Sequence, residues 1–203
     1  MSTKVEFKTV LELPTLIETS APTLENDLPF IERAGLKWAS IENLANSRAL
    51  PIYLADFLSA TDQAEPVGIE EALPLDGGFV LLLDETPAAY PRCCSDLSTW
   101  KEWLSAAECN SAHPELLWVG HPELYVSAID PDHISVTITP DIDGQSERVV
   151  TIRRKELITG IQHVHRLLQS MLPIIEANLP MDLKASSSEF ASKLLAIDRS
   201  LFE

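Results

Sequence analysis

The sequence predicts an α+β fold in which a largely antiparallel sheet is followed by a long helix and a short last helix. Two observations support this fold class. Residues 115–153 contain four short apolar segments separated by turn signals, which is typical of a β-meander. From Leu157 onward, apolar residues recur every three or four positions, which predicts a helix with one apolar face. No repeat or linker divides the 203 residues, so we expect a single domain over 1–203.

The first third of the chain mixes strand and helix signals. Apolar residues alternate over 4–11, which predicts a first strand. Between residues 30 and 58 they recur at helical spacing in two short pieces, and the second helix is expected to begin at Pro51. Residues 59–78 are rich in proline and glycine, so we expect a loop there.

The middle of the chain begins with a continuous apolar segment at 79–83, which predicts a central strand covered on both faces. A turn-rich segment over 86–96 follows it. Asp96 or Ser98 is then expected to cap a helix. One side of that helix carries Leu97, Trp100, Trp103 and Leu104.

The meander and the two last helices complete the expected fold. The expected strands are 116–119, 124–129, 134–139 and 149–152. The long helix follows Arg153, and Pro173 inside it is expected to kink it or end it. A short last helix is expected from about Ser187, because Ser186 and Glu189 have the spacing of a capping box.

Charge and cysteine content exclude several classes of protein. The chain has 15 Lys+Arg against 31 Asp+Glu, a net charge of −16. This imbalance argues against binding to nucleic acid, because phosphates need Lys or Arg to neutralise them, and equally against an anionic membrane surface. No apolar run has the length of a signal peptide or of a membrane span. Three cysteines, two of them adjacent, are typical of reduced thiols, so we expect a cytoplasmic location.

The acidic residues are unevenly distributed. No basic residue lies between Arg48 and Arg92, a window that holds eight acidic residues. One interpretation is a solubilising surface, and the other is a surface that recognises a basic partner. In the second case the contact residues would be Asp62, Glu65, Glu70, Glu71 and Asp76. The basic cluster at 153–155 opposes the dipole of the helix that it begins, so we expect it to pair with the protein's own acids.

Five possible metal ligands or catalytic groups lie within 29 residues, namely Cys93, Cys94, Cys109, His113 and His121. A structural zinc site normally takes two ligands from each of two turns, and here the spacing between Cys109 and His113 alone approximates such a pair. A catalytic cysteine with His121 as its base would need an orienting group and an activated thiolate, and neither is visible in the sequence. We therefore expect no catalytic residue, no metal and no cofactor. His165, on the flank of the apolar helix face, is expected to be a packing residue.

One stretch of sequence carries a resemblance to known proteins. The string Cys-Cys-Ser-Asp-Leu at 93–97 is followed by a tryptophan-bearing helix and by Trp-Val-Gly-His-Pro at 118–122. This order resembles small uncharacterised bacterial proteins, some of which look like cytoplasmic immunity proteins of toxin systems. The resemblance covers about residues 79–175. It implies an α+β fold and a binding role, with no catalytic residues.

Three functional hypotheses follow from these observations. The first is a non-enzymatic, acidic, cytoplasmic binding protein of the immunity type, which neutralises a cognate and basic toxin by protein–protein contact. The alternative is an acidic secretion or assembly chaperone that holds a client protein in an apolar groove. The third is a small thiol- or zinc-dependent enzyme built on the five cysteine and histidine residues. The sequence leaves the oligomeric state open.

Overall fold

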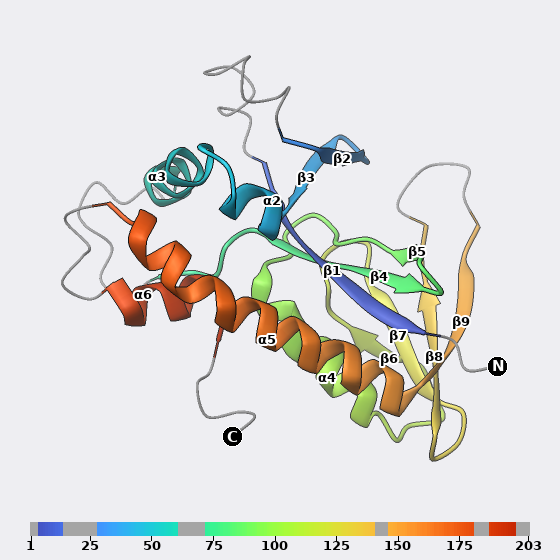
Figure 1. Ribbon diagram of the computed structural model, residues 1–203. Coiled ribbons are helices and arrows are strands. Elements are labelled where there is room, and N and C mark those ends of the chain that lie inside the picture. Colours follow the sequence, from blue (N-terminus) through green and yellow to red (C-terminus); the bar gives the residue numbers. More distant parts are fainter. Residues whose placement is uncertain (1–3, 14–27, 61–71, 141–145, 181–186, 198–203) are drawn as a thin grey trace. The chain divides into compact units, whose positions relative to one another are not determined.

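A computed structural model describes residues 4–13, 28–60, 72–140, 146–180 and 187–197 (Figure 1). The chain divides into two compact units, and β1 (Val5–Glu12) and α5 (Arg154–Asn178) contribute to both. The first unit consists of Met1–Thr9 and Asp76–Arg166. The second consists of Val10–Leu75 and Leu167–Glu203. Mixed helices and antiparallel strands confirm the predicted α+β class.

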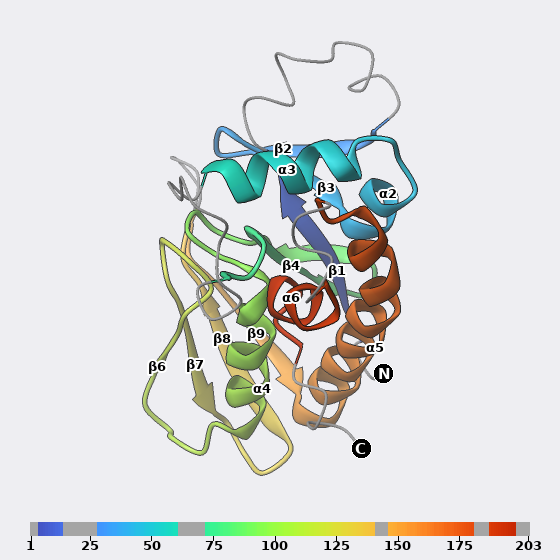
Figure 2. The same cartoon turned by 90° about the vertical axis from the view of Figure 1, so that its left-hand side faces the viewer.

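The predicted meander is the four-stranded antiparallel sheet of the first unit, in the order β6-β7-β8-β9. Its strands are β6 (Glu115–Leu117), β7 (Leu124–Ala128), β8 (His133–Ile138) and β9 (Arg148–Arg153). Successive side chains of a strand point to opposite faces, so each strand offers one set of residues to the core. The core-facing set is buried and apolar, and consists of Leu117, Leu124, Val126, Ile134, Val136, Ile138 and Ile152. Figures 1 and 2 show α4 (Trp100–Glu108) lying beside this sheet.

The first unit also contains β4 (Gly77–Leu83), which lies between β1 and β5 (Thr86–Ala89). The first five residues of β4 are buried, as expected for a central strand. β5 differs from the expected turn-rich segment. It pairs antiparallel with β4, and the register shifts between Leu81 and Leu82. Pro87 weakened the strand signal, but proline is tolerated in an edge strand, and β5 is the end strand of the five-stranded sheet that also contains β1 and β4.

Aromatic side chains form the centre of this first unit. Asp96 accepts a hydrogen bond from the amide of Ser98 over 2.6 Å and so begins the short helix η2 (Leu97–Thr99), which leads into α4. The ring of Trp103 then lies 5.2 Å from that of Phe7 on β1. On α5, Gly160 leaves room for the same phenylalanine, because a Cβ there would lie 3.2 Å from the Phe7 ring.

In the second unit, β2 (Phe30–Arg33) and β3 (Leu36–Ser40) form a hairpin beside the end of β1. The prediction of a helix at the start of the segment 30–58 is therefore wrong, because residues 30–40 form this hairpin. Ala34 and Gly35 have φ angles of 52° and 79°, and this pair of left-handed residues closes a two-residue hairpin. Helical structure begins at α2 (Ile41–Ala45), and α3 (Leu50–Ala60) begins one residue before the predicted Pro51.

The long and short last helices are confirmed as α5 and α6 (Ser187–Leu194). Of the two effects expected of Pro173, an end of the long helix is wrong, because α5 continues to Asn178. Pro173 removes a hydrogen bond to the carbonyl four residues earlier, at Gln169, and both residues are exposed, so water can satisfy that carbonyl. Ser186 of the proposed capping box lies outside the described residues.

Candidate functional site

The two halves of the resemblance motif meet in the first unit. The amide of His121 donates a hydrogen bond to the carbonyl oxygen of Cys93 over 3.1 Å, and the two residues form an isolated antiparallel bridge. The Cys93 thiol in turn lies 3.5 Å from the carbonyl oxygen of His121. The His121–Pro122 peptide bond is cis. Residues 93–97 and 118–122 therefore build one junction, although they are separate in sequence.

The junction depends on close backbone packing. Gly120 has a φ of 98°, and a Cβ built there would lie 2.5 Å from the carbonyl oxygen of Cys93. Arg92 is 3 % exposed, and its guanidinium donates to the carbonyl oxygen of Thr139 over 2.8 Å. Thr139 then donates from its hydroxyl to the carbonyl oxygen of Glu123. These contacts join the junction to the segments next to β7 and β8, so much of the motif has a structural role.

The five cysteine and histidine residues of the third hypothesis do not come together as one metal centre in the described part of the chain. Cys93 contacts the main chain of His121, whereas the buried Cys109 donates to Glu115, with 3.5 Å between sulfur and carboxylate oxygen. Cys94 and His113 are exposed. Within the described ranges, no group of three or more His, Cys, Asp and Glu side chains is placed to hold a metal ion.

His121 lies in an exposed polar and aromatic cluster beside the junction. Its Nδ1 lies 3.1 Å from a carboxylate oxygen of Glu123. Its ring meets the ring of Trp118 edge-on, with 4.6 Å between the ring centres. The imidazole thus lies between an acidic and an aromatic side chain. Cys93 contacts the main chain of His121 and not its ring. His165, by contrast, is buried and packs against Trp100, as the sequence predicted.

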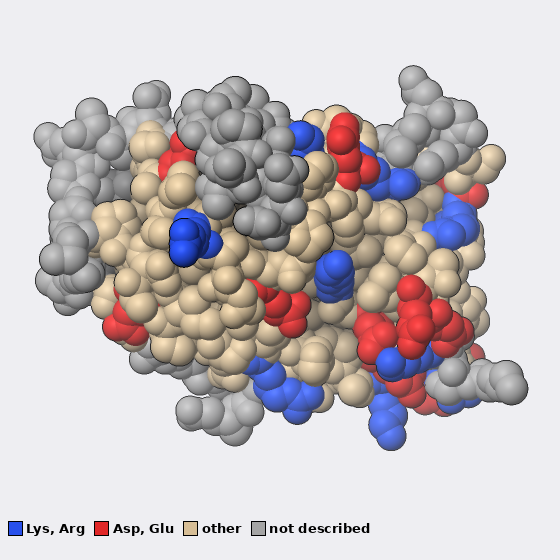
Figure 3. Space-filling view, turned by 45° about the horizontal axis from the view of Figure 1, so that its top comes forward, with Lys and Arg blue, Asp and Glu red and all other residues tan. Residues whose placement is uncertain are grey.

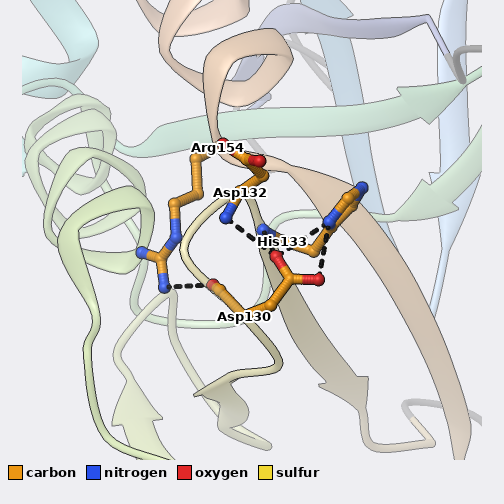
Figure 4. A network of polar contacts seen from close by, with 4 residues as sticks. All are labelled: Asp130, Asp132, His133 and Arg154. Carbon is orange, nitrogen blue, oxygen red and sulfur yellow. Dashed lines mark hydrogen bonds and ion pairs between the residues drawn. The ribbon is translucent and has the colours of Figure 1, made fainter.

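The basic cluster at 153–155 does not behave as predicted at Arg154, whose guanidinium contacts main-chain carbonyls. It donates to Ala107 near the end of α4 over 2.7 Å, and more weakly to Asp130 over 3.5 Å (Figure 4). Arg154 lies at the start of α5 but also reaches the end of a second helix, α4. A cation at the C-terminal end of α4 is favourable, because the helix dipole places negative charge there.

The carboxylate of Asp130 organises the turn between β7 and β8. It accepts hydrogen bonds from the main-chain amides of Asp132 and His133 and from the His133 ring (Figure 4). The His133 ring is the largest cause of the lowered pKa of Asp130, and the amide of Asp132 is the second. Asp132 itself accepts from the Arg154 amide through its main chain. The turn and the start of α5 are therefore one polar network.

Of the five acidic residues predicted to contact a partner, four lie outside the described residues, namely Asp62, Glu65, Glu70 and Glu71. The fifth, Asp76, immediately precedes β4 and forms an isolated bridge with Asp96. Partial burial of its carboxyl raises the pKa of Asp76, and the negative charge of Asp96 raises it further. Both causes disfavour the charged form of Asp76 in the folded protein.

The outer face of the β6–β9 sheet carries a feature that the sequence analysis missed. Register places Leu116, Tyr125, Thr137 and Val149 directly opposite one another on the four strands. Leu116 is 56 % exposed, Tyr125 38 % and Val149 59 %. Each strand alone shows ordinary alternation, and only the pairing register brings these apolar residues into one row.

Comparison with known proteins gives no family for this chain, since no family model, no curated protein and no solved structure matches it. Among the described residues, no helix has both the length and the apolar character needed to cross a bilayer.

Proposed function

We propose that this chain is a non-enzymatic, acidic binding protein of the immunity type, located in the cytoplasm. On this proposal it neutralises a cognate toxin, basic in charge, by protein–protein contact. Support comes from the net charge of −16, from the base-free window between Arg48 and Arg92, and from the resemblance carried by residues 79–175.

The observation that carries the proposal is the use that the first unit makes of its arginines. Arg92, Arg148 and Arg154 each donate to a main-chain carbonyl, on Thr139, Ala88 and Ala107 respectively. These cations therefore stabilise the fold at points where the chain needs a donor. Because these arginines serve the fold while the net charge of the chain is −16, the acidic excess remains able to attract a basic protein.

On the face drawn in Figure 3, one group of described carboxylates gathers at the lower right around blue side chains, and the others stand singly. Long-range attraction depends on the summed charge and does not need one dense patch. We therefore expect the acidic excess to accelerate encounter with the partner, and close contacts to determine how long the complex lasts.

The proposal is tested by affinity capture followed by a toxicity assay. The tagged full-length chain is used as bait in a lysate of its native host at low salt, and bound proteins are eluted with high salt. We expect a basic protein in the eluate, because salt screens charge–charge attraction. The gene for that protein is then expressed alone and together with this chain, and growth is measured.

Growth arrest by the captured protein alone, and relief by co-expression, is the expected result. Relief must require binding, so a variant of the chain that no longer captures the protein serves as the control. If the captured protein leaves growth unaffected, the immunity proposal is wrong. Capture that persists at high salt would favour the chaperone alternative, in which apolar contacts hold the client.

A further inference from the structure

We infer that the outer face of the β6–β9 sheet is a docking surface, and that its occupant is a basic protein. This inference rests on the proposed function, and it adds a surface that the predicted acidic contact residues do not include. We call this surface the outer face and define it by Leu116, Tyr125, Thr137 and Val149, together with Ser127, Ser135 and Thr151.

The exposed large apolar side chains of the first unit lie on or next to the outer face. Within the described part of the first unit, the large apolar side chains that are exposed are Leu116, Trp118, Tyr125, Ile129 and Val149. Three of them lie in the central row, where Thr137 stands between Tyr125 and Val149, and Trp118 and Ile129 directly follow the ends of β6 and β7. Single exposed apolar residues are normal, but several on one part of a surface favour an interaction site.

The remaining residues of the outer face suit an interface as well. Thr137 fills the central row between Tyr125 and Val149, and Ser127, Ser135 and Thr151 form the next row. Short hydroxyl side chains leave the surface flat and lose little conformational freedom when they are covered. Tyrosine adds a large, rigid contact area with a polar end, and it is enriched at protein interfaces.

The size of the outer face indicates what its occupant must do. The longest of the four strands have six residues. Four such strands about 4.8 Å apart, at about 3.3 Å per residue, would give a face of roughly 400 Å², which is an upper bound. A stable protein interface covers about 800 Å² on each partner. An occupant of the outer face must therefore also cover the surface around it.

That surrounding surface is acidic. Among the described residues, Asp130 and Asp132 lie in the turn at the end of the sheet where β7 stops and β8 begins. Glu123 and Glu147 lie at one end of the sheet, next to the starts of β7 and β9. Of the two arginines of β9, Arg148 donates to the carbonyl oxygen of Ala88, which leaves Arg153 as the exposed base. An apolar centre within an acidic surround fits a partner that has an apolar patch within a basic surround.

A second copy of this chain fits less well. Two copies would each carry a net charge of −16 and would bring their acidic surrounds together. Like-charge contact of this kind costs several kcal/mol in an interface. The same charge attracts a basic protein from a distance.

The test uses a photo-crosslinking amino acid, p-benzoylphenylalanine, in the full-length chain expressed in its native host. One variant replaces Tyr125 at the centre of the outer face. The matched control replaces Ile52, which is 44 % exposed on α3 in the second unit. We expect light to join the Tyr125 variant to one basic protein, and the Ile52 variant to yield at least about tenfold less of that adduct.

Charge is tested at one position in the middle of the row. Thr137→Arg and Thr137→Glu are introduced separately into the Tyr125 crosslinking variant. Both place a long polar side chain in the centre of the outer face, so they differ mainly in sign. We expect at least a tenfold loss of adduct with Thr137→Arg, which repels a basic partner, and a smaller loss with Thr137→Glu. Thermal unfolding of both variants confirms that each is folded.

Three outcomes would overturn the inference: equal adducts from both crosslinking positions, an adduct between two copies of this chain, or a greater loss with Thr137→Glu. Failure of the outer face is distinguishable from failure of the proposed function. If salt elution of the unmodified chain still releases a toxin, but the Tyr125 variant yields no adduct with it, the function stands and the surface is wrong. If neither experiment yields a basic protein, both are wrong.

Discussion

The amide of His121 donates a hydrogen bond to the carbonyl oxygen of Cys93 over 3.1 Å, although 28 positions of sequence separate the two residues. This contact joins the segment before α4 to the segment before β7. It also explains why a glycine precedes the histidine, since no side chain fits between the two strands of backbone at Gly120. The string that suggested a resemblance therefore includes residues that the fold itself requires.

Gly120→Ala is expected to be strongly destabilising. The new Cβ would lie 2.5 Å from the carbonyl oxygen of Cys93, and the alanine would have to adopt a φ of 98°. Gly35→Ala is the matched control, because Gly35 also has a positive φ, of 79°, but open space around it. We expect Gly35→Ala to lower the free energy of unfolding by about 1–2 kcal/mol and Gly120→Ala by roughly 2–5 kcal/mol. Equal losses in urea denaturation would contradict the steric argument.

Arg154→Met tests whether the first unit depends on guanidinium–carbonyl contacts. The substitution keeps most of the apolar stem but removes the donor to Ala107 and the positive charge at the end of α4. We expect the free energy of unfolding to fall by about 2–3 kcal/mol, because hydrogen bonds from charged groups are strong and the helix dipole loses its counter-charge. Arg153→Met, at the exposed neighbour, should change it by less than about 0.5 kcal/mol. Similar losses of stability in both variants would show that Arg154 contributes only its positive charge and not its contact with Ala107.

Much of the fold was predictable because its signals are local. The four strands of the meander alternate over short stretches with turn residues between them, and the apolar face of α5 recurs over many turns. The β2–β3 hairpin was missed because Ala34 takes a turn position where Asn or Asp gives a clearer signal. β5 was missed because of Pro87.

The candidate surfaces were less predictable because they depend on distant residues. Arg154 contacts a helix end that lies 47 positions away in sequence. The row formed by Leu116, Tyr125 and Val149 exists only in the pairing register of four strands. Composition predicted an acidic binding protein, but it contained no information about which face of a sheet carries apolar residues.

Asp130→Asn is expected to change the pH dependence of stability. In the folded protein the His133 ring and two amides lower the pKa of Asp130, so its contribution is present above the unfolded pKa of about 4 and is lost as pH falls through the lower folded value. The parent should therefore be more stable than Asp130→Asn at neutral pH, and the difference should shrink in acid. Urea midpoints from pH 7 to pH 2 measure this.

Asp132→Asn is the control, because the network contacts of Asp132 run through its main chain, and it should follow the parent. A difference between the parent and Asp130→Asn that persisted in acid would contradict the assignment.

Asp76→Asn is expected to act in the opposite direction on stability. Burial and the charge of Asp96 raise the pKa of Asp76 in the folded protein, so the ionised carboxylate destabilises the fold above that raised value. The variant should unfold at a higher temperature at neutral pH, and this gain should disappear as pH falls below the unfolded pKa. If Asp76 contacts the basic partner, the same variant should bind that partner more weakly. A variant that is more stable and binds equally well would remove Asp76 from the predicted contact set.

Charge reversal tests the predicted acidic contact residues as a group. Lysine at Asp62, Glu65, Glu70, Glu71 and Asp76 should weaken capture of the basic partner at low salt and flatten its dependence on salt, because fewer opposite charges then meet across the interface. The control reverses five exposed glutamates that lie elsewhere in the chain, namely Glu32, Glu42, Glu85, Glu108 and Glu189. Both variants change the net charge by the same amount, so long-range attraction falls equally in the two.

The readout is the rate at which the complex dissociates. A greater loss of binding in the first variant would place the contact at those residues. Equal losses would show that the partner responds to net charge alone, and close contact would then have to come from another surface.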